Sequence, residues 1–283
     1  PDYWQNRTDY VLKATLDPGR KTVSGSAVIT YTNNSPGVLH QLWLQLDQNR
    51  YRSDARANFS SDSAPGADQH TDGYRIASVE VEQGGQARPA HYIVNDTRMR
   101  VDLAQALKAN GGQLTLRIVY SYALPGQFGG RTDWYPSKNG DVFEVAQWYS
   151  RMCVYDDLRG WDTAPFLNNE FYLEYGDFDY SVTVPWNMLV VGSGELVNAD
   201  QVLTAGQRQR LAKARQSDAT VMIRTPAEVT DPSSRPKHSG TLTWHFRMKN
   251  SRDVAFGASA AYVWDAARIN LPEGKSALAM SAY

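Results

Sequence analysis

Apolar and polar residues alternate at every second position over much of this chain. The pattern is clearest at 42–46, 114–122 and 242–248, where apolar side chains occupy one face of each run and mainly polar side chains the other. Successive side chains of a β-strand point to opposite faces, so each run is typical of a strand with one face on a core. The sequence therefore predicts an all-β fold.

Turn-forming residues separate these runs at short intervals. Clusters of Gly, Pro, Asn and Asp occur at 17–19, 33–36, 84–85, 110–112 and 139–140. Frequent turns of this kind are typical of sandwiches and open sheets built from antiparallel strands. We therefore expect a saddle-like antiparallel β-sandwich or a set of open sheets.

Two segments depart from the alternation. Residues 204–216 are rich in Ala, Arg and Gln and follow Thr204, a good N-cap, so they predict one short helix. The basic side chains of this helix indicate a solvated face rather than an anion site. Residues 52–73 are polar and predict a long loop. Because no repeat or linker divides the chain, we expect a single β domain over residues 1–283.

The composition excludes several function classes. The 283 residues carry 29 basic and 30 acidic side chains, so there is no excess of positive charge of the kind that binds nucleic acid or an anionic membrane. No apolar run approaches the ~20 residues that span a bilayer. The one cysteine, Cys153, excludes an internal disulfide framework and a thiolate zinc cluster, and its apolar neighbours indicate burial.

Both ends of the sequence resemble cut ends. The chain begins at Pro1 without a methionine or a signal peptide, and it ends in the apolar run 276–283. An apolar terminal strand would leave an unpaired edge, so we expect a fragment of a longer protein. The missing methionine and the aromatic-rich β composition favour a periplasmic or secreted protein.

The chain contains no recognisable catalytic motif. A zinc peptidase of the commonest kind needs H-E-x-x-H, in which two histidines one helical turn apart share a face. The histidines stand at 40, 70, 91, 238 and 245, and none has that spacing. Residues 192–194 (GSG) do not form a G-x-S-x-G nucleophile turn and indicate the end of a strand. We expect the isolated chain to bind no catalytic zinc and to cleave no aminoacyl substrate.

Clustered carboxylates leave another alternative open. Candidates for a glycosidase pair or a calcium site are Asp156, Asp157, Glu170, Glu174, Asp177 and Asp179. Alternation over 170–175 predicts a strand with Glu170 and Glu174 on one face, which favours a solvent face or a domain interface. An independent glycosidase stays open, because the sequence does not show which carboxylates face each other.

Four motifs follow one another along the chain. They are the opening hairpin at 9–36, the strand LWLQLDQN at 42–49, the long segment 146–196 and the segment NSRDVAFGAS at 250–259. Within 146–196 stand Gln147, Arg151, an acidic turn at 156–157 and a strand that ends in TVP at 183–185. Together these motifs resemble the amino-terminal domain of the aminopeptidase N family of zinc metallopeptidases, the gluzincin aminopeptidases.

The resemblance implies a saddle of sheets that packs on a catalytic domain and caps one side of its cleft. That catalytic domain is absent from this chain and would hold the zinc, so no cofactor is expected in residues 1–283. The implied partners are the catalytic domain of the same protein and a peptide substrate at the domain boundary. An apolar surface is expected near 153–161 and on the carboxy-terminal strand, where the catalytic domain would dock.

The resemblance also implies the candidate substrate-binding residues, Gln147 and Tyr149. Gln147 would line the pocket for the amino end of the substrate, since an amide can accept from an ammonium and donate to a carbonyl. Two residues later the family often has Glu or Gln, whereas Tyr149 offers a phenol without countercharge. The alternative for Gln147 is a strand amide bonded to its neighbours. The alternative for the whole chain is a stand-alone β-sandwich module that binds carbohydrate or protein through exposed Trp and Tyr.

Overall fold

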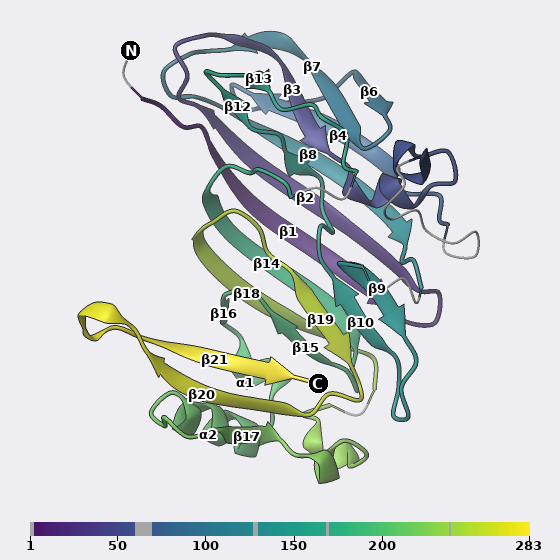
Figure 1. Cartoon of the computed structure of the whole chain (residues 1–283), viewed down its shortest axis with the longest axis vertical. Helices are drawn as coiled ribbons and strands as arrows, with labels where there is room; N and C mark the ends of the chain where they lie inside the picture. The colour runs from purple at the N-terminus through teal and green to yellow at the C-terminus, as the bar shows by residue number, and fades with distance from the viewer. Residues whose placement is uncertain (1–2, 60–69, 127–129, 168–169, 238) are drawn as a thin grey trace.

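A computed structural model of the chain describes residues 3–59, 70–126, 130–167, 170–237 and 239–283, and it shows several β-sheets and two short helices (Figure 1). The largest sheet has eight strands in the order β16-β18-β14-β1-β2-β8-β4-β5. The bounds are β1 (Arg7–Asp17), β2 (Thr22–Asn33), β4 (Arg75–Gln83), β5 (Gln86–Pro89), β8 (Gly112–Ala123), β14 (Gly176–Pro185), β16 (Glu195–Leu196) and β18 (Thr241–Ser251). Strands β1 and β14 are parallel, and the other neighbouring pairs are antiparallel.

One face of the large sheet is buried, as the alternation predicts. On β8 the side chains at 114, 116, 118, 120 and 122 are all buried, while those between them are exposed or half-buried. The same pattern holds along β14, where every second residue is buried. This periodicity gives the sheet a single apolar face that other elements must cover.

Two four-stranded sheets cover that face. One has the order β11-β3-β7-β6 and the other β15-β19-β10-β9. Their bounds are β3 (Leu39–Gln45), β6 (Tyr92–Asn95), β7 (Arg98–Leu107), β9 (Thr132–Tyr135), β10 (Val142–Val145), β11 (Arg151–Met152), β15 (Leu189–Gly192) and β19 (Phe256–Ser259). Buried side chains of these strands, such as Leu42, Leu44 and Phe143, belong to the same apolar cluster as those of the large sheet. The expected all-β fold of sandwiched and open sheets is confirmed.

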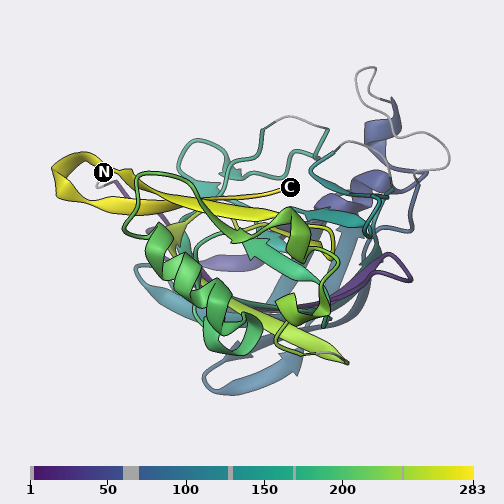
Figure 2. The same cartoon turned by 90° about the horizontal axis from the view of Figure 1, so that it is seen from below.

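The carboxy-terminal part forms a further layer at one end of the molecule (Figures 1 and 2). A three-stranded sheet of β17 (Val221–Arg224), β20 (Trp264–Asn270) and β21 (Ser276–Ala282) packs against α2 (Ala205–Ala214). Thr204 caps α2 by accepting from the Gln207 backbone N–H, as predicted. A single helical turn, α1 (Ala199–Val202), precedes α2 and was not predicted, because four residues are too few to show a helical period.

Short elements complete the described chain. They are the hairpin β12 (Tyr155–Asp156) and β13 (Gly160–Trp161), and the 3-10 turns η1 (Asp47–Tyr51), η2 (Arg56–Phe59), η4 (Pro226–Glu228), η5 (Pro232–Ser234) and η6 (Pro272–Gly274). The predicted loop 52–73 includes η2, and its residues 60–69 lie outside the described residues. Among the described residues, no helix has the length and apolar character required to cross a membrane.

The strand predicted at 170–175 is wrong. These residues form no strand, although the Tyr175 carbonyl accepts from the Thr8 N–H of β1, and β14 begins only at Gly176. Leu173 and Glu174 are consecutive and both buried, so the side chains do not alternate between two faces. The exposed carboxylate face predicted for this segment is therefore wrong for Glu174.

The apolar surface expected near 153–161 and on the last strand is present in part. Cys153 is fully buried and Trp161 is half-buried against Tyr31 and Tyr155. On β21, in contrast, Ala279 and Tyr283, the residue after the strand, are exposed. Leu158, within 153–161, is 87% exposed as well, so both regions expose apolar side chains.

Candidate functional site

Three segments far apart in the sequence meet at the buried side chain of Arg151. Strand β11 pairs with β3 so that Arg151 lies opposite Gln45, and its Nη2 donates to Gln45 Oε1 at 3.1 Å. Its Nε donates to Asp47 Oδ2 at 3.0 Å, and its Nη1 donates to Asp253 Oδ2 at 2.8 Å. We call Gln45, Asp47, Tyr149, Arg151 and Asp253 the arginine cluster.

The arginine cluster is largely buried, although the Asp253 side chain is 23% exposed. The side chains of Arg151 and Asp47 are each 1% exposed, and the guanidinium carbon lies 4.1 Å from the centre of the Phe171 ring. Burial alone would lower the pKa of Arg151, but the carboxylates of Asp47 and Asp253 outweigh it and hold that pKa above its ordinary value. Arg151 is therefore charged at every working pH, and its two carboxylate partners fix three segments in one geometry.

Tyr149 belongs to this cluster rather than to an open pocket. Its side chain is fully buried, and its hydroxyl donates to Asp253 Oδ1 at 2.7 Å. Burial, followed by the charge of Asp253, raises the pKa of Tyr149 well above its usual value, so the phenol stays protonated. The contact of Tyr149 with Asp253 positions the loop between β18 and β19. A contact between Tyr149 and the substrate stays a prediction.

Gln147 lies at the amino-terminal side of the cluster in an unusual backbone conformation. Its φ of 53° falls in the left-handed region, which costs a non-glycine residue about 1–2 kcal/mol. Gln48 Nε2 donates to the Gln147 carbonyl at 2.9 Å and to Thr132 Oγ1 at 3.1 Å, which holds the turn. Gln147 Nε2 is buried and has no acceptor among the described residues. An unbonded amide on a strained, well-held turn is the feature that marks Gln147 as a functional candidate.

Several of the carboxylates considered from the sequence have structural partners. Asp156 Oδ1 accepts from the backbone N–H groups of Leu158 and Arg159 and so stabilises the turn between β12 and β13. Asp179 accepts from His245 and Arg247 on the neighbouring strand. In the part of the chain that the structure describes, no three or more His, Cys, Asp or Glu side chains gather as a metal site.

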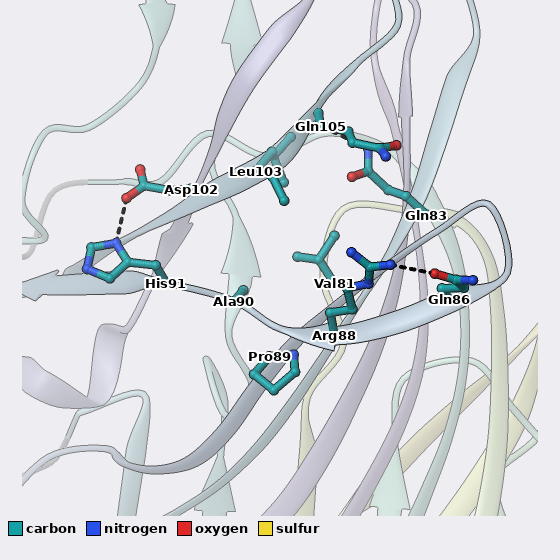
Figure 3. A pocket seen from close by; sticks show the side chains of 11 residues that line it. Val81, Gln83, Gln86, Arg88, Pro89, Ala90, His91, Asp102, Leu103 and Gln105 are labelled. Carbon is teal, nitrogen blue, oxygen red and sulfur yellow. Dashed lines mark hydrogen bonds and ion pairs between the residues drawn. The ribbon is translucent and has the colours of Figure 1, made fainter.

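A cavity of about 260 Å³ lies away from the arginine cluster, between β4, β5 and β7 (Figure 3). His91 Nδ1 and Asp102 Oδ2 lie 2.7 Å apart at one end, and Arg88 Nη2 donates to Gln86 at the other. Its lining residues include no Trp, Tyr or Phe, which does not fit a platform for stacking sugar rings. None of Gln147, Tyr149 and Arg151 lines it.

Comparison with known proteins shows similarity at the level of the fold. No protein-family model matches the sequence, and no curated protein matches it. The solved structure of an M1 zinc metallopeptidase from Deinococcus radiodurans matches with a TM-score of 0.51 and 13% identity, over 99% of this chain and 47% of that one. A mutant of the enzyme from that organism, bound to a Tyr-Ser-Ala substrate, gives a TM-score of 0.51, 14% identity, and coverage of 99% and 48%.

A third structure, a two-domain M1 zinc metallopeptidase mutant bound to L-tryptophan, has a TM-score of 0.52 and 14% identity. Its match covers 99% of this chain and 48% of that chain. This chain therefore spans about half the length of the solved structures that it matches. Its fold is similar to that of part of an M1 zinc metallopeptidase.

Proposed function

We propose that residues 1–283 are the amino-terminal, non-catalytic β domain of an aminopeptidase N-like zinc metallopeptidase. The observation that carries the proposal is the fold match over 99% of this chain to about half of an M1 zinc metallopeptidase. A second observation supports the proposal independently of overall shape. Arg151 brings together three of the family-like motifs, which lie at 42–49, 146–196 and 250–259. The function of the domain is to pack on the catalytic domain and to line the pocket for the amino end of the substrate.

Zinc belongs to the catalytic domain in this proposal. The described residues of this chain offer no fitting ligand set, since His91 and His245 each pair with an aspartate rather than with other ligands. No catalytic step is therefore assigned to residues 1–283. Their contribution is binding and orientation, for which Gln147 is the candidate because its amide donor has no acceptor within the described chain.

The sequence encoded after Tyr283 tests this proposal directly. An H-E-x-x-H motif followed by a later Glu is expected there. The complete protein should bind about one zinc per chain and hydrolyse aminoacyl p-nitroanilides, whereas purified residues 1–283 should do neither. A following sequence without zinc-ligand spacing, or aminoacyl hydrolysis by the isolated chain, would contradict the proposal.

A surface with several aromatic side chains favours the second candidate function, a stand-alone carbohydrate-binding module. The Trp4 and Tyr155 rings stack with their centres 5.8 Å apart, and the Tyr155 and Trp161 ring centres lie 5.2 Å apart. These three residues are half-buried, while Tyr172 is exposed. Partly exposed rings of this kind can stack on sugars. Affinity electrophoresis in soluble polysaccharides, with Trp4→Ala as the comparison, separates the two functions: retardation that Trp4→Ala abolishes supports the module.

A further inference from the structure

Two buried arginines at the carboxy-terminal end of the molecule form no ion pair with any carboxylate that the structure describes. Arg224 ends β17 and is 2% exposed, and Arg235 follows η5 and is 3% exposed. In the part of the chain that the structure describes, neither forms an ion pair, in contrast to the doubly paired Arg151. Buried charges in proteins are normally paired, because an unpaired buried ion carries a large desolvation cost.

Backbone carbonyls take up most of the donors of these two side chains. Arg224 donates to the carbonyls of Glu228, Val229, Ala260 and Tyr262, and Arg235 donates to those of Trp186 and Met188. Each guanidinium nevertheless keeps one buried N–H group without an acceptor among the described residues, at Arg224 Nε and at Arg235 Nη1. Carbonyl contacts hold the two side chains in place but do not neutralise their charge.

Both arginines line one cavity of about 460 Å³. The exposed residues Lys138, Asn187 and Thr230 line it as well, and they add a third cation and two neutral polar side chains. The electrostatic surroundings of the cavity are therefore positive, and Lys138 and Asn187 add exposed side chains that can donate hydrogen bonds.

The neighbouring carboxylates are already engaged. Asp231 lies at the exposed rim of the cavity, where its two oxygens accept from the backbone N–H and the hydroxyl of Ser233. Glu228 accepts both Nη groups of Arg210 through its two oxygens, and it also accepts from Thr225. Among the described residues, no carboxylate therefore forms an ion pair with Arg224 or Arg235.

The two cations also act on each other. Burial, and then the charge of Arg224, lowers the pKa of Arg235 to about 10. Burial likewise lowers the pKa of Arg224, although the charge of the nearby Glu228 acts in the opposite direction. The face of the Trp244 ring, 5.8 Å from the guanidinium carbon of Arg235, offers only a weak partner for that charge. An anion in the cavity would relieve both the burial cost and the mutual repulsion.

We propose that the cavity lined by Arg224, Arg235 and Lys138 binds a small phosphate-bearing anion. Phosphate carries a charge of about −1.5 to −2 at neutral pH and has several strong acceptor oxygens, which suits three cations opposed by one carboxylate at the rim. A monocarboxylate brings a single charge and two oxygens and satisfies this site less well. The proposal concerns a different surface from the arginine cluster and does not rest on the proposed peptidase function.

Titration calorimetry with inorganic phosphate at constant ionic strength tests the proposal on the intact chain. Phosphate should bind one site per chain, and acetate should bind at least about tenfold more weakly. Phenyl phosphate is the second probe: equal or tighter binding than free phosphate indicates a phosphate ester as the ligand, and weaker binding indicates the free ion. Phosphate should also raise the melting temperature above that in sodium chloride of equal ionic strength.

Matched variants locate the site. Lys138→Gln, at an exposed position, should weaken phosphate binding by roughly tenfold without affecting folding, whereas Lys13→Gln, at an exposed position of β1, should leave it unchanged. Asp231→Asn should tighten binding several-fold, because it removes the negative charge at the rim. Absence of phosphate and phenyl phosphate binding would overturn the proposal. The proposal would also be overturned if Lys138→Gln and Asp231→Asn bound phosphate with the same affinity as the unmodified chain.

Discussion

Arg151 Nη1 and Asp253 Oδ2 lie 2.8 Å apart although 102 positions separate the two residues in the sequence. The contact joins β11 to the loop between β18 and β19, and Tyr149 donates to the other oxygen of the same carboxylate. Asp47, 1% exposed, binds the opposite side of the guanidinium. The cluster therefore fixes Tyr149 and Arg151, which follow Gln147 closely in the sequence, and so connects a stability element with the candidate substrate contact.

Replacing Arg151 should be strongly destabilising. Arg151→Met keeps much of the side-chain volume but leaves the Asp47 carboxylate buried without its cation, which costs about 3–5 kcal/mol. Urea unfolding followed by tryptophan fluorescence measures the loss. Arg208→Met, on the exposed face of α2, is the control and should change stability by less than about 0.5 kcal/mol. Equal effects of the two substitutions would show that the arginine cluster does not stabilise the fold.

Removing the Tyr149 hydroxyl should lower the stability of the chain. Tyr149→Phe deletes the hydrogen bond to the charged Asp253, worth about 1.5–3 kcal/mol, and preserves the ring packing. Tyr3→Phe, at a highly exposed ring, is the control and should be neutral. If Tyr149→Phe instead raises KM of the complete protein at unchanged stability, Tyr149 contacts substrate as the sequence suggested.

Local patterns were sufficient to predict most of the fold. Alternation in β8 and β18 gave the buried faces, and Thr204 marked the start of α2. These features depend on neighbours within a strand or a helical turn, so a short stretch of sequence is enough to predict them. The strand predicted at 170–175 failed because its apparent alternation has no neighbouring strand to pair with. Burial of Glu174 depends on tertiary contacts with residues that lie outside this short stretch of sequence.

The site was only partly predictable for the same reason. Gln147 and Arg151 were recognised in one motif, and Asp47 and Asp253 stood within two others, but their mutual contacts join positions about 100 residues apart. A charged residue directly after a strand with a buried face, as at Asp47 after 42–46, was the one available signal for a buried partner. The unbonded amide and positive φ of Gln147 are properties of the folded chain and leave no trace in the sequence.

Gln147 should separate function from stability in the complete protein. Gln147→Ala removes an amide donor that has no acceptor in the described chain, so stability should change little while kcat/KM falls roughly 5- to 30-fold. Gln209→Ala on exposed α2 is the control for the removal of a glutamine. Zinc content and melting temperature are measured on the same preparation. Lower stability with unchanged kcat/KM would mean that Gln147 is a structural amide.

The positive φ of Gln147 allows a second, independent comparison. Gln147→Gly should be more stable than Gln147→Ala by about 1 kcal/mol, because glycine adopts the left-handed region without a Cβ penalty. Both variants lack the amide and should lose kcat/KM to the same extent. Equal stability of the two variants would show that the turn relaxes when the side chain is removed.

Glu174 should make the stability of the chain fall as the pH rises. Burial, with a smaller contribution from the Asp156 charge, raises the pKa of Glu174 from 4.5 to about 7. Below pH 4.5 the carboxyl is neutral in both the folded and the unfolded chain and contributes nothing. Between these two values the unfolded chain releases the proton more readily, so folding is penalised increasingly, up to roughly 3 kcal/mol above the folded pKa.

Glu174→Gln should therefore remove this part of the pH dependence. A neutral amide has no proton to lose, so the free energy of unfolding of the variant should exceed that of the unmodified chain increasingly from about pH 5 to about pH 8. Urea unfolding at several pH values in that range measures the difference. Glu195→Gln, at an exposed position on β16, should leave the pH profile unchanged. A constant difference between Glu174→Gln and the unmodified chain across the range would show that Glu174 is ionised in the folded chain throughout.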